Sequence, residues 1–251
     1  MSSPCKICVF GLGETTVERI EHGSEIIWYD PECFDSFQRD FFEIDYWREQ
    51  DAICGKAVGR NTTWFVKDAV CDKVLRHYYR GGMIGRVMED TFLHVAESKS
   101  RAMAEFTVLA KLYRRGLPVP RPCAARMVRS NLVYRADIIL SLVANSLDLV
   151  AVLKERALTK EEWQTVGKTI RRFHDAGLYH ADLNSHNILL DADGKIWLID
   201  FDKCHFREPN TWTRENMDRL LRSFRKEKGL HTDFHWQEAD WRILLNSYKT
   251  K

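Results

Sequence analysis

The sequence lacks the features of a membrane-spanning protein, a secreted protein or a small disulfide-stabilised scaffold. No apolar run approaches the roughly 20 residues that a spanning helix needs. The apolar stretch at residues 7–12 is too short for a signal peptide, so we expect no leader. The chain has 251 residues, 45% hydrophobic and 29% charged, which excludes disordered and collagen-like chains. We therefore expect a globular protein with a core large enough to build a cleft.

Paired cysteines are also lacking. The seven cysteines are an odd number and are scattered along the chain. Only Cys5 and Cys8 form a Cys-x-x-Cys motif, and no second pair completes a zinc site. We expect reduced thiols in a cytosolic protein, with a redox pair at Cys5 and Cys8 as the alternative.

Acidic residues are absent from one long stretch, between Phe106 and Ala136. The net charge is only +2, but residues 1–72 hold 7 Lys or Arg against 14 Asp or Glu, whereas residues 73–135 hold 13 against 4. This segregation predicts either an anionic partner or a solvated cationic face that pairs locally with the acidic first segment. The basic residues of the acid-free stretch are Lys111, Arg114, Arg115, Arg121, Arg126, Arg129 and Arg135.

The first half of the chain has the patterns of β-strands with one main helix. Over residues 99–115, apolar residues recur at helical spacing until Gly116 and Pro118 end the helix. Short runs rich in β-branched and aromatic residues predict strands around it. We therefore predict an antiparallel sheet with one main helix as an N-terminal lobe, residues 1–144. The predicted strands are residues 25–29, 62–66, 74–79, 119–128 and 132–143.

Aromatic residues also cluster near helical spacing between residues 34 and 47. We interpret them as a helix that packs against the sheet, and a membrane-facing stripe is the alternative. The cluster consists of Phe34, Phe37, Phe41, Phe42, Tyr46 and Trp47.

The second half of the chain has helical patterns and forms the predicted C-terminal lobe, residues 145–251. Its clearest helix is residues 159–176, where Thr159 and Glu162 match a capping box and Gly177 provides the end. The remaining predicted helices are residues 147–155, 213–227 and 236–247, and two short strands, 188–190 and 196–199, flank a turn at residues 191–194. The fold class is therefore α+β, with two lobes.

A polar motif follows the clearest helix. His180, Asp182 and Asn187 stand at the spacing of the protein-kinase catalytic loop, with His-Ala-Asp in place of His-Arg-Asp, and Asp200-Phe201-Asp202 resembles Asp-Phe-Gly. Phosphoryl transfer needs one carboxylate beside the acceptor hydroxyl, and a carboxylate and an amide oxygen on Mg²⁺. We predict Asp182 as the catalytic base and Asn187 and Asp200 as metal ligands, with His180 bracing the loop. The alternative is a polar loop of capping carboxylates.

The nucleotide half of the motif is less regular. Gly55 and Gly59 precede a predicted strand, where a glycine-rich phosphate loop would lie, but the full Gly-x-Gly-x-x-Gly is missing and an ordinary turn is the alternative. Arg76 occupies the position of the usual kinase lysine. Its guanidinium can bind phosphate oxygens, although the exchange for lysine is not neutral. Glu105, on the main helix, is its predicted partner.

The segments around these residues resemble one kinase family. Arg76-His77-Tyr78-Tyr79-Arg80-Gly81-Gly82, residues 101–106 and 116–120, and the two polar motifs look like the 3-deoxy-D-manno-octulosonic acid (Kdo) kinases, of the lipopolysaccharide kinase group with a protein-kinase-like fold. The likeness runs from about residue 37 to residue 223. It implies ATP-dependent phosphorylation of the Kdo sugar on a lipid A precursor, with the Mg²⁺ that the kinase-like motif predicts. Residues 1–144 would then be the nucleotide-binding lobe and residues 145–251 the catalytic lobe.

The resemblance also implies a place of action and a set of partners. It predicts peripheral attachment to the cytoplasmic side of the inner membrane of a Gram-negative bacterium, with a glycolipid substrate and no nucleic acid. About 50 residues follow Asp202, without an Ala-Pro-Glu landmark, which also favours an acceptor other than protein. The alternatives are a pseudokinase-like binding protein and a small-molecule phosphotransferase of the aminoglycoside-kinase kind.

Overall fold

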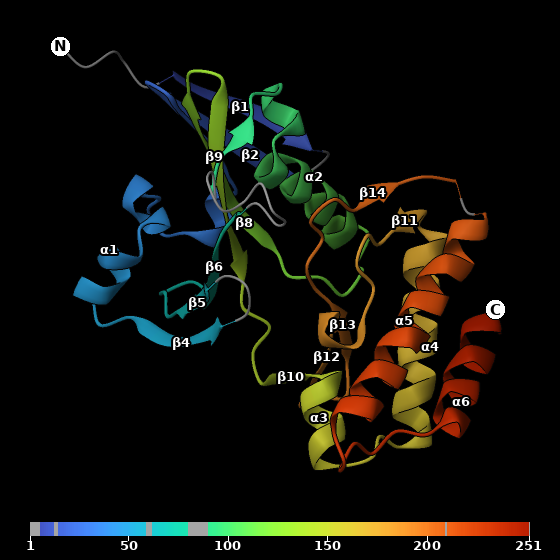
Figure 1. The fold of residues 1–251 in the computed structure, drawn as a ribbon. Coiled ribbons are helices and arrows are strands. Elements are labelled where there is room, and N and C mark those ends of the chain that lie inside the picture. Colours follow the sequence, from blue (N-terminus) through green and yellow to red (C-terminus); the bar gives the residue numbers. More distant parts are fainter. Residues whose placement is uncertain (1–5, 13–14, 59–61, 80–89, 209, 251) are drawn as a thin grey trace. The chain divides into compact units, whose positions relative to one another are not determined.

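The computed structural model describes residues 6–12, 15–58, 62–79, 90–208 and 210–250, and the chain divides into two compact units (Figure 1). Unit 1 consists of Met1–Arg114 and Pro120–Leu142, and unit 2 of Arg115–Val119 and Val143–Lys251. The predicted α+β class and two-part organisation are confirmed. The short segment Arg115–Val119 joins unit 2 because its backbone is bonded there: Leu198 N–H donates to the Pro118 carbonyl over 3.0 Å. Assignment of residues 1–144 and 145–251 as nucleotide-binding and catalytic lobes stays a prediction.

Unit 1 is built on an antiparallel sheet (Figure 1). The strands at 25–29 and 62–66 match the prediction at both ends, whereas β1, β2 and β4 were not predicted. β2 carries Glu18, Arg19 and Glu21, which weaken the apolar alternation that identifies a strand. In sheet order the strands are β1 (Lys6–Leu12), β2 (Thr15–His22), β3 (Glu25–Tyr29), β8 (Pro122–Ser130), β9 (Val133–Ser141), β6 (Lys73–His77), β5 (Thr62–Val66) and β4 (Ile53–Val58), and β7 (Phe92–Leu93) also pairs with β9.

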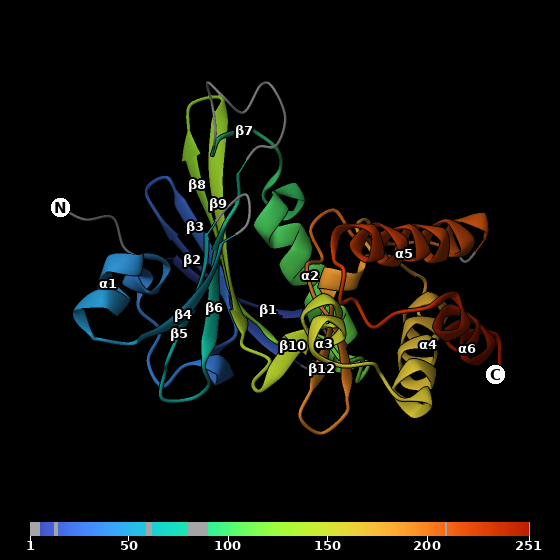
Figure 2. The same cartoon turned by 60° about the horizontal axis from the view of Figure 1, so that its bottom comes forward.

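Helices cover the two faces of this sheet, with α2 and α1 on opposite sides (Figure 2). Helix α2 (Arg101–Arg114) follows the 3₁₀ turn η4 (Glu97–Lys99) and packs on β8 and β9. The rings of Trp28 and Phe106 meet edge-to-face there, with centroids 6.4 Å apart. The opposite face is covered by η1 (Pro31–Cys33), η2 (Arg39–Phe42) and α1 (Ile44–Glu49).

The aromatic cluster of residues 34–47 lies in this second layer. Phe34, Phe41, Phe42 and Trp47 are buried, and the Trp47 indole N–H donates to the Phe41 carbonyl over 2.9 Å. Packing against the sheet is therefore the role of these rings, not an exposed stripe. The segment is not one helix, however, because only residues 44–49 are α-helical.

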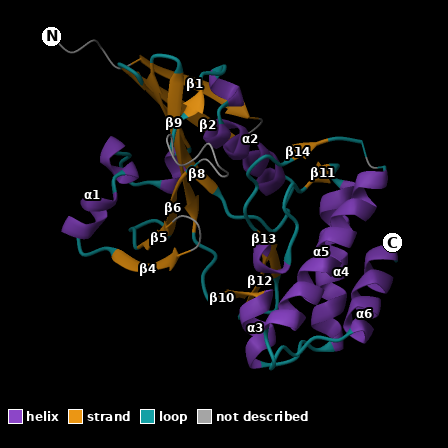
Figure 3. Cartoon of the chain, in the orientation of Figure 1, coloured by secondary structure: helices purple, strands orange, loops and turns teal. Residues whose placement is uncertain are grey.

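Unit 2 is mostly helical (Figure 3). The predicted capping box of Thr159 and Glu162 is present, with both of its hydrogen bonds formed. Its elements are β10 (Ser146–Asp148), α3 (Leu149–Glu155), α4 (Lys160–Asp175), β11 (Leu178–Tyr179), η5 (Ser185–Asn187), β12 (Ile188–Asp191), β13 (Ile196–Leu198), β14 (His205–Phe206), α5 (Thr211–Leu230) and α6 (Glu238–Lys249).

Helices α4 and α6 pack at close range around Gly167. A Cβ atom at this position would lie 2.3 Å from the Leu244 carbonyl oxygen, so only glycine fits. Trp163 and Phe224 meet edge-to-face, and Phe224 stacks on Trp236 with centroids 5.8 Å apart. These contacts form the core that supports the loop after α4. Within the described residues, every helix is too short or too polar to cross a lipid bilayer.

Candidate active site

The loop that follows α4 and β11 carries the predicted catalytic residues of unit 2. Gly177 ends the helix with φ of 77°, a conformation that favours glycine, and the chain then enters β11. Asp182 lies on the exposed part of this loop. An exposed carboxylate on a braced loop can accept a proton from an incoming hydroxyl.

His180 braces the loop from within. It is 2% exposed, and its Nε2 lies 3.2 Å from the Ile199 carbonyl oxygen, which favours the tautomer with hydrogen on Nε2. Asn216, on α5, holds the His180 backbone at both its N–H and its carbonyl. Burial lowers the pKa of His180, and the Asp200 and Asp182 carboxylates only partly offset this effect. His180 is therefore a neutral structural side chain.

Asn187 is oriented by the backbone beside Asp182. Its side-chain N–H donates to the Asp182 carbonyl over 2.9 Å, so the amide oxygen is the remaining polar atom of this side chain. The preceding turn is capped by Asn184, whose side-chain oxygen accepts from the N–H groups of His186 and Asn187. Asn187, the last residue of η5, thus has a fixed position.

Asp200 follows β13 in a left-handed backbone conformation, with φ of 62°. Such a conformation is costly for a residue other than glycine and is often found at functional sites. The turn is held by the Ile199 N–H, which donates to the Asn187 carbonyl over 3.0 Å, and by Phe201, which is buried against Phe173 and His180. Backbone bonding therefore links the Asn187 and Asp200 segments directly.

The carboxylate and amide oxygens of this loop are ligands that a hard cation prefers. Among the described residues, no three His, Cys, Asp or Glu side chains converge as a metal-binding group. A metal here would have one or two carboxylates and the Asn187 amide oxygen as protein ligands. Mg²⁺ is bound in this manner, with water and substrate phosphates completing its coordination, so the residues fit it.

In unit 1 the structure places Arg76 beside its predicted partner. Arg76, on β6, forms an ion pair with Glu105 on α2, whose side chain is fully buried. The Tyr78 hydroxyl donates to the same Glu105 oxygen over 2.5 Å, and strand alternation puts Arg76 and Tyr78 on one face. Burial, and then the Glu105 charge, raise the pKa of Tyr78 well above its usual value, so the phenol remains protonated.

The glycine pattern of residues 55–60 is only partly within the described residues. The predicted loop position of Gly55 is wrong, because Gly55 lies inside β4, at a register shift against β5. A Cβ on it would meet the Phe65 ring at 3.1 Å, so close cross-strand packing explains this glycine. Gly59, and likewise Arg80, Arg86 and Cys5, lie outside the described residues.

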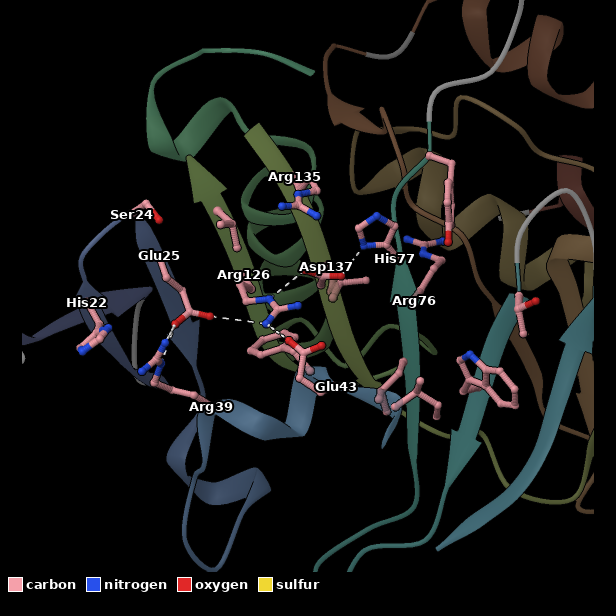
Figure 4. Close-up of a pocket in the computed structure, with 18 of the residues that line it drawn as sticks. His22, Ser24, Glu25, Arg39, Glu43, Arg76, His77, Arg126, Arg135 and Asp137 are labelled. Carbon is pink, nitrogen blue, oxygen red and sulfur yellow. Dashed lines mark hydrogen bonds and ion pairs between the residues drawn. The ribbon is translucent and has the colours of Figure 1, made fainter. Parts of the chain in front are cut away.

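Sequence reasoning missed a polar pocket of about 670 Å³ on the face of the unit 1 sheet that α1 covers (Figure 4). The residues that line it include a chain of connected ion pairs. Arg126 is bonded to Glu43, to Glu25 and, over 2.8 Å, to Asp137, which also binds His77 Nδ1 over 2.6 Å. The only signal for it in the sequence was the separation of acidic and basic segments.

The same contacts favour local pairing with the acidic first segment as the explanation for the basic, acid-free stretch. Arg126 pairs with acids of the first segment, and Arg121 does so through Asp30 over 2.7 Å and Glu32 over 2.6 Å. Arg121 has a raised pKa, because these carboxylates outweigh the effect of its burial. Local pairing therefore accounts for these two arginines.

Comparison with known proteins gives a consistent result. A family model described as the lipopolysaccharide kinase (Kdo/WaaP) family matches residues 44–248. The chain is also similar to curated proteins named 3-deoxy-D-manno-octulosonic acid kinase. It is 40% identical to one from Vibrio parahaemolyticus over 92% of this chain and 97% of the relative. It is 41% identical to one from Vibrio vulnificus strain CMCP6 over 94% and 99%, and 44% identical to one from Mannheimia succiniciproducens over 84% and 91%.

Proposed function

The chain belongs to the lipopolysaccharide kinase (Kdo/WaaP) family, and from this membership we propose that it phosphorylates a hydroxyl of the Kdo sugar on a lipid A precursor, with ATP as donor. The observation that carries the chemical part of the proposal is the braced loop of unit 2. It presents an exposed carboxylate at Asp182, an oriented amide at Asn187 and a carboxylate at Asp200, the groups that phosphoryl transfer requires.

Each of these side chains has one proposed role. Asp182 accepts the proton of the sugar hydroxyl as that oxygen attacks phosphorus. Asn187, through its amide oxygen, and Asp200, through its carboxylate, would hold Mg²⁺. The ion, when bound, neutralises charge on the phosphates. The hydrogen bond from Asn187 to the Asp182 backbone keeps the base and the first ligand in a fixed relation.

Arg76 is proposed to bind nucleotide phosphate oxygens, with Glu105 and Tyr78 fixing its guanidinium. A guanidinium stays ionised and offers several donors in one plane, whereas the usual lysine offers a point charge. Gly55, whose backbone lies in β4, and Gly59 are proposed as the second part of the phosphate site.

A glycolipid substrate implies action at a membrane surface, and we propose peripheral attachment to the cytoplasmic side of the inner membrane. Exposed cations such as Arg135, on the pocket side of the sheet and 54% exposed, would favour an anionic surface. Sedimentation of the chain with vesicles of anionic lipid, but not with neutral vesicles, would support this attachment. No sedimentation with either would contradict it.

The enzymatic proposal is tested by incubating the purified chain with ATP, Mg²⁺ and a Kdo-bearing lipid A precursor. Mass spectrometry should show one added phosphate, and the same precursor without Kdo should remain unchanged. Equal phosphorylation of both lipids would refute the sugar acceptor. ATP binding without transfer to either lipid would favour a pseudokinase-like binding protein instead.

A further inference from the structure

Three cysteines from separate segments of unit 1 meet inside it. Cys33 ends η1, Cys71 lies in the turn before β6, and Cys123 lies on β8. Cys33 and Cys123 belong to one buried core cluster, and Cys71 packs against it. The Cys123 thiol donates to the Arg121 carbonyl over 3.6 Å and also interacts with the two other cysteines. Cys33 and Cys123 are 1% and 0% exposed, whereas Cys71 lies at the edge of the same core and is partly exposed. One thiol of this cluster is therefore open to small reagents, and the two other thiols lie in the core against which it packs.

The surroundings of Cys71 favour its thiolate. Lys73 is fully buried, and its ammonium lies 3.0 Å from the Cys71 carbonyl oxygen and 3.7 Å from the Cys71 sulfur. The interaction with Cys123, together with the Lys73 charge, lowers the pKa of Cys71 to about 6, although burial and the Asp68 carboxylate, which pairs with Lys73, act in the opposite direction. Burial raises the pKa of Cys123, which keeps its proton and donates it to the Arg121 carbonyl.

We propose that Cys71 is a site of oxidation by hydroperoxides and that Cys123 resolves the product into an intramolecular disulfide. In the first step the Cys71 thiolate attacks the peroxide, the O–O bond breaks, and the sulfenic acid and hydroxide form. In the second step the Cys123 sulfur attacks the sulfenic sulfur, the S–O bond breaks, and water leaves with the Cys123 proton. The two cysteine sulfurs lose two electrons in total, and the peroxide gains them.

The bond would join the turn before β6, the strand that carries Arg76, to β8. Cys71 lies five positions before Arg76, and Cys123 lies on β8, the strand on the far side of β9 from β6. The residues between them would form a closed loop of about 50 residues, which restricts the unfolded chain and stabilises the folded one. Cys54 is exposed and lies on β4, outside the cluster, so it serves as a matched control.

The test treats the full chain with hydrogen peroxide, blocks remaining thiols, and maps peptides by mass spectrometry without reduction. We expect a linked Cys71–Cys123 peptide in the native chain and in Cys54→Ser, no such peptide in Cys71→Ser, and its loss on reduction. A sulfinic acid at Cys71 without the linked peptide would overturn the proposal, since Cys123 would then not resolve it. A Cys33–Cys123 bond formed in place of the Cys71 bond would overturn it as well.

A second measurement uses the native chain and does not depend on any variant folding. Alkylation of Cys71 by iodoacetamide is followed between pH 6.5 and 8.5. For an ordinary thiol with a pKa of about 8.5 the thiolate fraction rises about 50-fold over this range. For a pKa of about 6 it rises by less than about 1.5-fold. A rate at Cys71 that rises as steeply as that of an ordinary thiol would contradict the activated cysteine.

Discussion

The two units hold their functional side chains by different means. In unit 1, Arg76 is fixed by an ion pair with a fully buried carboxylate, and Lys73 is itself buried beside Asp68. In unit 2, most bonds that brace the loop are between neutral groups, such as Asn216 with the His180 backbone and Ser185 with Ser223. The exposed His186 is the charged exception, beside Asp148 and Glu227.

This difference has energetic consequences. Removing one partner of a buried ion pair leaves a charge in a medium of low polarity, which costs about 3–5 kcal/mol. Removing one partner of a neutral hydrogen bond costs about 1–3 kcal/mol when the other group stays buried. We therefore expect the stability of unit 1 to depend strongly on single charges, and the loop of unit 2 to tolerate loss of the charge it exposes.

The largest expected effect is the loss of turnover in Asp182→Ala with stability unchanged. Asp182 is exposed, so its side chain contributes little to folding, but without a base kcat should fall by at least about 10²–10⁴-fold. Transfer to the Kdo-bearing lipid and unfolding in urea are measured together. Asp193→Ala, at an exposed position of the β12–β13 turn, is the control and should retain full turnover. Near-native kcat in Asp182→Ala would contradict the assigned base.

In unit 1, Arg76→Ala should lower the stability strongly, whereas Asp182→Ala leaves it unchanged. The Glu105 carboxylate loses the guanidinium while it stays buried, and we expect a loss of about 3–5 kcal/mol in the free energy of unfolding. Arg76→Lys keeps the charge and should be less destabilised. Arg135→Ala, at a more exposed position of β9, is the control and should change stability by under about 0.5 kcal/mol. If Arg76→Ala and Arg135→Ala unfold at the same urea concentration, the contrast between the units fails.

We expect the stability of unit 2 to be most sensitive to added side-chain volume between closely packed helices. In Gly167→Ala the new methyl group meets the Leu244 carbonyl at 2.3 Å, so α4 and α6 must separate, at a cost of about 1–3 kcal/mol. Gly229→Ala, in α5, has open space around the new Cβ and should be neutral or stabilising by up to about 1 kcal/mol. Thermal unfolding of the two variants measures the difference, and equal melting temperatures would show that the α4–α6 contact can relax.

Elements with local signals could be predicted from the sequence, and elements defined by distant contacts could not. The capping box of Thr159 and Glu162 marks α4 within its own first turn, and the β12–β13 turn is similarly local. By contrast, Gly55 resembles a loop glycine until the Phe65 ring that packs on it is known.

The same distinction applies to the site. Arg76 and Glu105 are 29 residues apart, and their pairing was predicted only because both matched a family motif. Tyr78, which binds the same carboxylate, lies in the segment of residues 76–82 that resembles the family, but its bond to Glu105 was not predicted. The chain of ion pairs around Arg126 was missed, since its members come from β3, β8, β9 and η2 with its flanks, and only the fold brings them together.

The smallest expected effect is on the pH dependence of stability, to which His77 in unit 1 and His174 in unit 2 should contribute with opposite sign. Burial acts to lower the pKa of His77, but the Asp137 hydrogen bond and the Asp137 and Asp90 charges outweigh it, so the pKa is raised above 6.5. Its stabilisation is fully present below the unfolded pKa and is lost as the pH rises through the folded pKa. Burial lowers the pKa of His174 to about 4, so its folded form is neutral, and stability falls as the pH drops from about 6.5 towards 4.

Urea unfolding of the native chain, His77→Gln and His174→Gln at pH 7 and 5.5 separates the two contributions. Between these pH values the neutral His174 costs the native chain about 1 kcal/mol, because the unfolded chain takes up a proton that the folded chain does not. The deficit of His174→Gln relative to the native chain should therefore shrink at pH 5.5. The deficit of His77→Gln should grow, because protonated His77 lies between two carboxylates, Asp137 at 2.6 Å and Asp90 at 3.6 Å. Shifts of the same sign in both variants would show that the sheet unit and the helical unit do not differ in how they treat a buried charge.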